Sequence, residues 1–315
     1  MKTITILDTT VASDNLGDQI ILDAVKDVLL EVVPQAYPYH VATHEYMTNV
    51  SKSLLRKSEA AFVAGTNILA SNMEARVLWK LLPWDAFAFR ETILLGCGWM
   101  NYMKQPNAYS RWILKKILSD KFTHAVRDNY TAEKLRSMGK QVLNTSCPTM
   151  WRLDPQHCKS IPTGKASSVV TTLTFYLNRQ EEDKKMIEIL KDRYDTVYFW
   201  PQQREDTAYL ASMNISGLKF IDPTLAAYNH FLDNEDVDFV GTRLHGGIRA
   251  MQKFRRALIV KVDNRATEIS KDTGLPTMDR KDFDRMSNWI SGSDAPPIKL
   301  PVDAIETWKR QFKGA

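Results

Sequence analysis

Apolar residues follow two alternating patterns along this chain. Short apolar runs, such as residues 4–9 and 60–65, are typical of buried strands, and longer segments between them repeat an apolar residue every three or four positions. The segment 17–33 shows the second pattern on one helical stripe: Ile20, Ile21, Ala24, Val25, Val28, Leu29 and Val32. Strands that alternate with helices predict parallel sheets in a doubly wound α/β architecture.

The same pattern gives the expected elements in full. In the first half we expect strands at 4–9, 60–65, 92–96, 123–127 and 141–144, and helices at 17–33, 71–82, 108–121 and 128–139. In the second half we expect strands at 168–174, 196–200, 217–221, 237–241 and 256–260, and helices at 180–193, 224–234, 246–254 and 302–314.

The alternation breaks once, near the middle of the chain. Pro148, Pro155 and Pro162 interrupt it, and small polar residues follow. We therefore predict two α/β domains and a final helix: 1–150, a linker at 151–166, 167–300, and a helix within 301–315.

Composition narrows the class of protein. The 315 residues include 42 basic and 37 acidic ones, a net charge of +5, which suits an anionic substrate or a membrane surface and is too small for a nucleic-acid-binding protein. The three cysteines, Cys97, Cys147 and Cys158, form no C-x-x-C pair, so neither a disulfide framework nor a metal site is expected. The start of the chain lacks the features of a signal peptide, and no apolar run is long enough for a transmembrane helix. We expect a cytoplasmic protein.

Open α/β sheets bind ligands at the carboxyl ends of their strands, so the residues there are the candidates. After the first strand come Asn15, Gly17 and Asp18, at the entry of a helix. They form either a helix cap or a substrate contact. They do not form a G-x-G-x-x-G dinucleotide motif.

Three further strand ends in the first half carry candidates. Gly65, Thr66 and Asn67 form either a plain turn or a cradle for a phosphate or sugar hydroxyl. Arg127 follows the strand 123–127 and either binds an anion or pairs with the next carboxylate. Gly96 and Gly98 allow close backbone approach, and Cys97 between them has no activating histidine nearby in sequence.

The second half ends two strands on informative residues. Gln202 follows 196–200 and is able to donate and accept hydrogen bonds, as sugar recognition requires. The strand 237–241 leads into Arg243, a fixed planar cation, and His245, which exchanges a proton near neutral pH. Gly246 and Gly247 follow at a helix start, where free N–H groups attract anions. Arg243 and His245 are therefore the candidate catalytic residues.

With these residues in view, the chain resembles the polysaccharide pyruvyl transferase family. The resemblance runs nearly from end to end, and the R-L-H-G stretch is its most specific part. The matching stretches, in order, are NLGDQIILDAV, AAFVAGTNIL, AVRDNYTAEKLRSMG, CPTMW, FWPQQREDTAYL and DFVGTRLHGGIRAM. The chain departs from the family where Gly65-Thr66-Asn67 replaces three glycines and where GCGWM replaces a glycine–proline.

The resemblance implies a GT-B-like fold, in which two Rossmann-like domains face a cleft and the C-terminal helix packs back on the first domain. It implies transfer of the pyruvyl group of phosphoenolpyruvate, bound on the C-terminal side, onto sugar hydroxyls of a polysaccharide, glycan precursor or lipid-linked saccharide bound on the N-terminal side. Arg243 would hold the carboxylate or the phosphate of the donor, and His245 would act either as an acid and base or as a second hydrogen-bond donor to the phosphate. No metal or other cofactor is implied.

Two other functions remain open. A nucleotide-sugar glycosyltransferase would share the fold, with Arg243 on a diphosphate and Glu205 or Asp206 on the ribose. A non-catalytic binding protein on the same scaffold is the second. Separately, the basic amphipathic segment 110–122, with Trp112, Ile113, Ile117 and Leu118, leaves peripheral membrane contact open.

Overall fold

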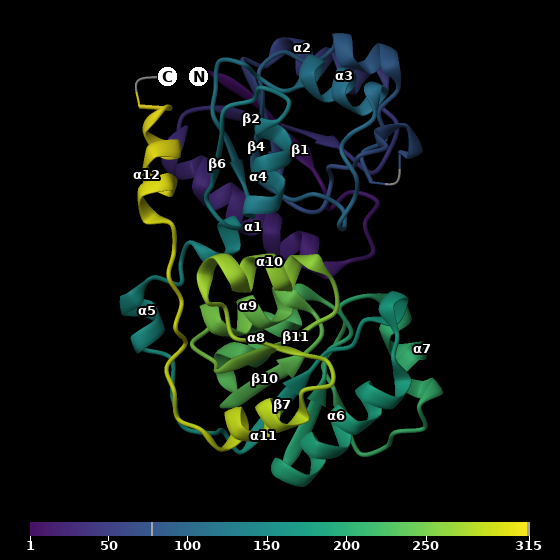
Figure 1. The fold of residues 1–315 in the computed structure, drawn as a ribbon, viewed down its shortest axis with the longest axis vertical. Coiled ribbons are helices and arrows are strands. Elements are labelled where there is room, and N and C mark those ends of the chain that lie inside the picture. The colour runs from purple at the N-terminus through teal and green to yellow at the C-terminus, as the bar shows by residue number, and fades with distance from the viewer. Residues whose placement is uncertain (77, 314–315) are drawn as a thin grey trace. The chain divides into compact units, whose positions relative to one another are not determined.

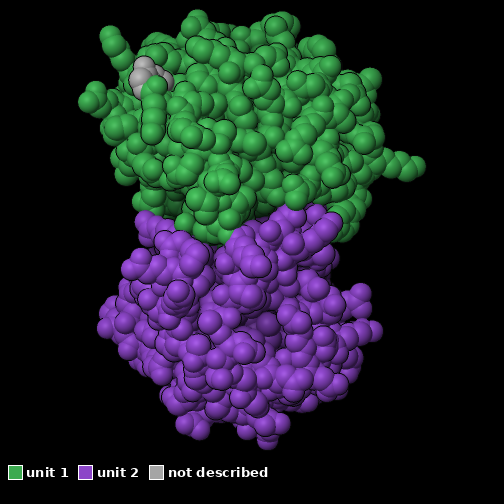
Figure 2. Space-filling view, turned by 60° about the vertical axis from the view of Figure 1, so that its left-hand side comes forward, with its two compact units in different colours: residues 1–13, 21–151, 300–315 green, residues 14–20, 152–299 purple. Residues whose placement is uncertain are grey.

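The computed structural model describes residues 1–76 and 78–313 and confirms the predicted α/β class. It contains two six-stranded sheets, and every strand pair in both is parallel. The chain divides into two compact units, coloured separately in Figure 2. Unit 1 comprises residues 1–13, 21–151 and 300–315, and unit 2 comprises residues 14–20 and 152–299.

The first sheet has the strand order β2-β1-β3-β4-β5-β6. Its strands are β1 (Thr3–Asp8), β2 (Tyr37–Ala42), β3 (Ala60–Ala64), β4 (Thr92–Cys97), β5 (His124–Val126) and β6 (Val142–Asn144). The helices of this half are α1 (Leu16–Val32), α2 (Asn49–Lys57), α3 (Ala108–Ile117) and α4 (Asn129–Arg136), with 3-10 turns η1 (Met73–Ala75), η2 (Pro83–Phe87) and η3 (Pro148–Met150). Apolar side chains from both faces of this sheet form two buried clusters.

The second sheet has the order β12-β11-β10-β7-β8-β9. Its strands are β7 (Ser168–Thr171), β8 (Thr196–Phe199), β9 (Lys219–Phe220), β10 (Val237–Gly241), β11 (Ala257–Lys261) and β12 (Thr277–Asp279). The helices are α5 (Pro155–Lys159), α6 (Gln180–Arg193), α7 (Arg204–Ser212), α8 (Leu225–Asn234), α9 (Leu244–Gln252), α10 (Asn264–Thr273) and α11 (Phe283–Ser291), with the turn η4 (Phe175–Leu177). The segment 151–166, expected as a linker, includes α5.

The C-terminal helix α12 (Val302–Arg310) packs on unit 1, as expected (Figure 1). Trp308 and Phe312 are buried among residues of β1, β3 and β4. Phe312 contacts the rings of Phe62 and Phe122 at centroid distances of 5.6 and 5.7 Å. Residues from the two ends of the chain therefore share one core.

The helix expected over 71–82 was wrong. Met73–Ala75 form a single 3-10 turn, and Arg76 adopts a left-handed conformation, with φ of 50°, that ends it. Residue 77 lies outside the described residues. Trp79 and Leu81 are buried in the unit 1 core, so the apolar residues that suggested a helical stripe are held by tertiary packing of an irregular segment.

Each sheet has an edge strand that the hydrophobic pattern did not predict. β2 is largely exposed and contains Pro38. Proline has no backbone N–H to donate, and an edge strand tolerates it because one side of that strand has no neighbouring strand to bond. β12 is only three residues long. Five helices were also missed: α2, α5, α7, α10 and α11.

Within the described residues, none of the helices combines the length and the apolar character that crossing a bilayer requires.

Candidate functional site

The sheet of unit 2 changes direction between β7 and β10, and this switch point is where an open α/β sheet forms a ligand crevice. β7 is followed along the chain by β8 on one side, whereas β10 and β11 lie on the other. The two strand ends are tied together: the Thr242 N–H donates to the Thr172 carbonyl oxygen at 3.0 Å, and the Arg243 N–H donates to Thr172 Oγ1 at 3.1 Å. Arg243 therefore lies at the switch point, and His245 follows it two residues later along the chain.

Arg243 is buried and held on all sides by its own unit. Its Nε donates to the Leu173 carbonyl oxygen at 2.8 Å and to Asp206 Oδ2 at 3.1 Å, Nη2 donates to Asp206 Oδ1, and Nη1 donates to Gln203 Oε1 at 2.5 Å. The guanidinium also lies 5.3 Å from the ring centroid of Tyr176. Each of the three nitrogens thus has a protein partner, so the charge of Arg243 is fixed in place before any ligand arrives.

Asp206 is the fully buried counter-charge of this arginine. Burial raises the pKa of the Asp206 carboxyl, and Arg243 opposes that shift. The carboxylate also accepts the N–H of Gln203 at 3.0 Å and the N–H of Phe175 at 3.3 Å, which anchors the first turn of α7 and the segment after β7. Both oxygens are therefore occupied, which removes Asp206 from the ribose role considered above and leaves Glu205, exposed on the same turn.

Two glutamines connect this centre to the segment 14–20. Gln202 Nε2 donates to Asn15 Oδ1 at 2.8 Å, and Gln203 Nε2 donates to Asp14 Oδ1 at 3.0 Å. The backbone joins them too, since the Leu16 N–H donates to the Gln202 carbonyl oxygen at 3.0 Å. The segments 14–18, 201–203 and 242–247 therefore meet within unit 2.

Gly17 has a steric reason to be glycine. A Cβ at this position would lie 2.7 Å from Gln202 Nε2 and 3.1 Å from Asn15 Oδ1, and the Gly17 N–H itself donates to Asn15 Oδ1 at 3.0 Å. Asp18 is buried in the first turn of α1. The NLGD sequence is thus a tight loop shaped around the Gln202 amide.

His245 is buried in the first turn of α9. The first hydrogen bond inside this helix runs from the Gly247 N–H to the Arg243 carbonyl oxygen at 3.1 Å, so the N–H groups of residues 244–246 precede it. Beneath this turn, Tyr228 donates to the Gly246 carbonyl oxygen at 2.9 Å. A helix start beside a switch point is suited to an anion.

The two glycines of α9 serve close packing. A Cβ on Gly247 would lie 2.5 Å from Ile259 Cγ1 of β11, so glycine lets the helix approach the sheet. A Cβ on Gly246 would lie 3.3 Å from Gln202 Oε1, a buried oxygen with no hydrogen-bond partner among the described residues. Gly246 therefore keeps the space beside that acceptor open.

In unit 1 the switch point lies between β1 and β3, and Gly65, Thr66 and Asn67 follow β3 there. Gly65 has a positive φ of 70°, and a Cβ there would lie 2.3 Å from Ile21 Cγ2, so a turn at this place requires glycine. Thr66 also has a positive φ, of 59°, and Asn67 Oδ1 is buried without a hydrogen-bond partner among the described residues. The strained turn and the unsatisfied amide oxygen make this loop the candidate ligand-binding element of unit 1.

Arg127 is buried and pairs with its neighbour, one of the two alternatives that the sequence left open. Its Nε and Nη2 donate to Asp128 Oδ2 at 3.2 and 3.0 Å, and Asp128 Oδ1 accepts the Thr131 N–H at the start of α4. Gly98 makes room for this guanidinium, because a Cβ there would lie 2.3 Å from Arg127 Cζ. Gly96 likewise faces Pro148, so both glycines approach protein atoms.

Cys97 does not have the properties of a nucleophile. It is fully buried, and burial raises the pKa of its thiol to about 12. A thiolate is therefore not available near neutral pH.

Sequence reasoning missed several polar residues at these strand ends. In unit 1, Asp8 Oδ2 lies 2.8 Å from His40 Nδ1, and Asp8 Oδ1 accepts hydrogen bonds from Thr10. In unit 2, Thr172 and Asp206 were not placed near Arg243. Asp8 and Thr172 were missed because the predicted strands 4–9 and 168–174 included them, whereas β1 ends at Asp8 and β7 at Thr171. His40 was missed because β2, which carries it, was not predicted.

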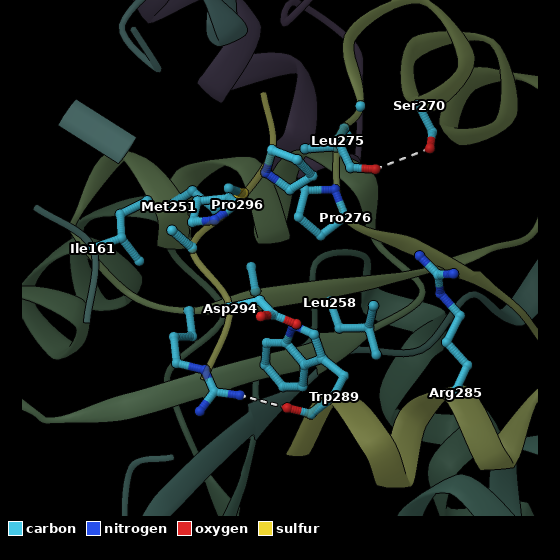
Figure 3. Close-up of a pocket in the computed structure, with 15 residues that line it drawn as sticks. Ile161, Met251, Leu258, Ser270, Leu275, Pro276, Arg285, Trp289, Asp294 and Pro296 are labelled. Atoms are coloured by element: carbon cyan, nitrogen blue, oxygen red, sulfur yellow. Dashed lines mark hydrogen bonds between the residues drawn. The ribbon is translucent and has the colours of Figure 1, made fainter. Parts of the chain in front are cut away.

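Two cavities in unit 2 lie at opposite ends of its strands. One, of about 650 Å³, has a mostly apolar wall and is lined by residues after β8 and by the segment 14–16, including Gln202, Gln203 and Arg204. The other, of about 550 Å³, lies where β11 begins (Figure 3). There Arg256 donates from Nη2 to the Trp289 carbonyl oxygen at 2.7 Å, and Leu258 and Pro296 also line the cavity. Only the first cavity adjoins the predicted site residues.

Among the described residues, no group of three or more His, Cys, Asp or Glu side chains is arranged to hold a metal ion.

Solved structures share this fold. A UDP-GlcNAc 2-epimerase from Methanocaldococcus jannaschii aligns with 11% identity and a TM-score of 0.55, covering 100% of both chains. S. aureus MnaA, in a co-structure with UDP, aligns with 13% identity and a TM-score of 0.54, covering 100% of this chain and 97% of its own. At these identities the likeness concerns the GT-B-like fold alone.

No curated protein matches the chain at a significant level. The sequence profile of the polysaccharide pyruvyl transferase family matches residues 15–264, which is most of the chain. The match includes the segments 201–203 and 242–247 and residues 15–18 of the third segment. The chain therefore belongs to the polysaccharide pyruvyl transferase family.

Proposed function

We propose that this protein transfers the pyruvyl group of phosphoenolpyruvate onto two hydroxyls of a sugar and forms a cyclic ketal. The observation that carries the proposal is the meeting of segments 14–18, 201–203 and 242–247 at the β7/β10 switch point. It places a fixed cation, an imidazole and a helix start in one unit. Asp14, Leu16, Gln202 and Gln203 of the same segments line a cavity of about 650 Å³. Family membership supports the same activity.

The reaction needs these groups together. A proton adds to the methylene carbon of the donor, which becomes a methyl group, and positive charge develops at the neighbouring carbon. One sugar hydroxyl adds to that carbon, phosphate leaves with the electrons of its C–O bond, and the second hydroxyl closes the ring. The two hydroxyls release two protons, of which one replaces the proton used on carbon and the other leaves on phosphate.

His245 is the group we assign to proton transfer, because an imidazole donates and accepts protons near neutral pH. The N–H groups that begin α9 are assigned to an anionic group of the donor. Arg243 has a different role from a free clamp: its charge is balanced by Asp206, so we assign it to setting the position of the turn that carries His245.

A titration of the purified protein with phosphoenolpyruvate, beside one with UDP-GlcNAc, tests the assignment. A ligand of the folded state raises the apparent stability, by about 2.7 kcal/mol at a concentration one hundred times its Kd. For the wild type we expect phosphoenolpyruvate to raise the stability and to give binding heat in calorimetry. Both effects should be weaker in Arg243→Lys, because lysine cannot make the bidentate contact with Asp206. Stabilisation by the nucleotide sugar alone would instead identify a glycosyltransferase.

If phosphoenolpyruvate binds, release of inorganic phosphate in the presence of a panel of saccharides identifies the acceptor. Mass spectrometry then checks for the ketal. Phosphate release without a pyruvylated product would contradict group transfer.

A further inference from the structure

The helix α3 has two different faces. The apolar residues that suggested membrane contact, Ile113, Ile117 and Leu118, are buried in the core of unit 1. The exposed face of α3 carries Trp112 and, one helical turn later, Lys115 and Lys116. The surface character of this region therefore comes from residues other than the predicted apolar stripe.

Exposed aromatic side chains gather here on two adjoining elements, α3 and η2, which pack against each other. Trp84, Phe87 and Trp112 have exposed fractions of 60%, 66% and 43%. Large aromatic side chains at such exposure are expensive in water unless a partner covers them.

The residues form a continuous row. Trp84 and Phe87 lie three apart in a 3-10 helix, which places them on one face. Lys116 Nζ lies 5.3 Å from the ring centroid of Phe87. Lys116 is four residues after Trp112 on α3, so these two also share a face. We call Trp84, Phe87, Trp112, Lys115 and Lys116 the aromatic–basic row.

The exposed charges on α3 and η2 themselves have one sign, whereas Glu74 lies at the start of α3 and Asp120 follows its end. The α3 sequence, AYSRWILKKI, contains three basic residues and no acidic one. The η2 sequence contains one acid, Asp85, which is fully buried with Lys52 Nζ 2.8 Å from its Oδ1. The large exposed side chains of both elements are therefore aromatic or cationic.

Aromatic residues beside lysines match the boundary between lipid headgroups and acyl chains, where rings insert and ammonium groups meet anionic headgroups. We propose that the aromatic–basic row docks unit 1 on an anionic lipid bilayer. The proposal rests on the proposed function for its purpose, since it makes a lipid-linked saccharide the acceptor class, but its test needs neither donor nor acceptor.

Co-sedimentation with vesicles provides the test. The wild-type protein is expected to bind vesicles of phosphatidylcholine mixed with phosphatidylglycerol and to bind phosphatidylcholine alone weakly. In Lys115→Glu/Lys116→Glu, partitioning onto the mixed vesicles should fall on the order of tenfold or more, because each basic residue near the surface contributes about a factor of five. The matched control is Lys184→Glu/Lys185→Glu, two consecutive exposed lysines on α6 of unit 2, which should bind like the wild type.

The apolar half of the proposal has its own variant. Trp84→Ala/Phe87→Ala should lose binding while its thermal melt stays that of the wild type, whereas Phe220→Ala, which removes an exposed aromatic ring of unit 2, should keep binding. Equal binding to both vesicle types, no binding of the wild type, or equal losses in a variant and its control would overturn the proposal. Vesicle binding by a protein that fails to bind phosphoenolpyruvate would support this docking surface and refute the proposed function alone.

Discussion

Asp206 accepts hydrogen bonds from two nitrogens of Arg243, and both side chains are buried in unit 2. This relationship changes the meaning of the arginine. A guanidinium already neutralised inside the protein organises the switch point. In the proposed reaction, His245 and the start of α9 are the groups assigned to the donor.

Asp206→Ala should destabilise the protein strongly. It leaves a buried guanidinium without its counter-charge, which costs about 3–5 kcal/mol when one partner of a buried pair is removed. Urea unfolding of unit 2, followed by a probe within it, measures the loss. Glu205→Ala is the matched control, since Glu205 is the exposed preceding residue of the same turn and its removal should change stability by less than about 0.5 kcal/mol. Equal effects of the two substitutions would show that the ion pair does not hold the fold.

Gly17→Ala should lower activity by displacing the Gln202 amide. The added Cβ would lie 2.7 Å from Gln202 Nε2, so either the amide or the segment 14–18 must move, at a cost of about 1–3 kcal/mol. Steady-state kinetics of phosphate release measure the loss. Gly164→Ala, where a Cβ meets nothing within 4 Å, should leave the kinetics unchanged. A Gly17→Ala enzyme with wild-type kinetics would separate this loop from catalysis.

His245→Ala should lower kcat by about 10²–10⁴, the range for loss of a general acid or base. Circular dichroism and binding of phosphoenolpyruvate would show whether the fold and the donor site persist. His230→Ala, on the exposed part of α8, is the comparison and should retain full activity. A His245→Ala enzyme within a few-fold of wild type would assign proton transfer to another group.

The sequence identified several residues of this hydrogen-bonded centre but not the contacts between them. Arg243, His245, Gln202 and Asn15 were found because each follows a strand, and strand ends carry ligands in open α/β sheets. The partner of Arg243 could not be found that way, because Asp206 lies in a helix that the hydrophobic pattern did not predict. The assignment of residues 14–20 to unit 2 is also a tertiary fact, which local periodicity does not contain.

The same limit explains the errors in the elements. Residues 71–82 combine apolar spacing with good helix formers, yet burial of Trp79 and Leu81 in an irregular segment prevails over local propensity. β2 was missed for the opposite reason: an exposed edge strand has no continuous apolar run to find. The central strands were predicted because they are buried on both faces and are therefore continuous apolar runs in the sequence.

Trp308→Ala should destabilise unit 1 by about 3–5 kcal/mol, the range for removing a large buried aromatic side chain. Trp308 is fully buried against the core that β1, β3 and β4 form. Guanidinium chloride unfolding measures the change. Trp84→Ala is the matched control, because the same side chain is removed from an exposed place and should cost less than about 0.5 kcal/mol. A small effect at Trp308 would mean that the C-terminal helix does not contribute to the unit 1 core.

His124 should make the stability of unit 1 depend on pH. Its Nε2 donates to the Ser119 carbonyl oxygen at 3.0 Å and its Nδ1 accepts the Leu94 N–H at 3.2 Å, an arrangement that suits the neutral ring. Burial lowers the pKa of His124 to about 4 from the ordinary value of 6.5. The unfolded chain therefore takes up a proton first as pH falls, so stability is complete above about pH 6.5 and is lost progressively towards pH 4, by about 2 kcal/mol at pH 5. Unfolding free energies of the wild type and of His124→Gln between pH 7 and pH 5 isolate this contribution, because the carboxylates titrate alike in both. If the two proteins lose stability in parallel, the buried ring is not the group that titrates.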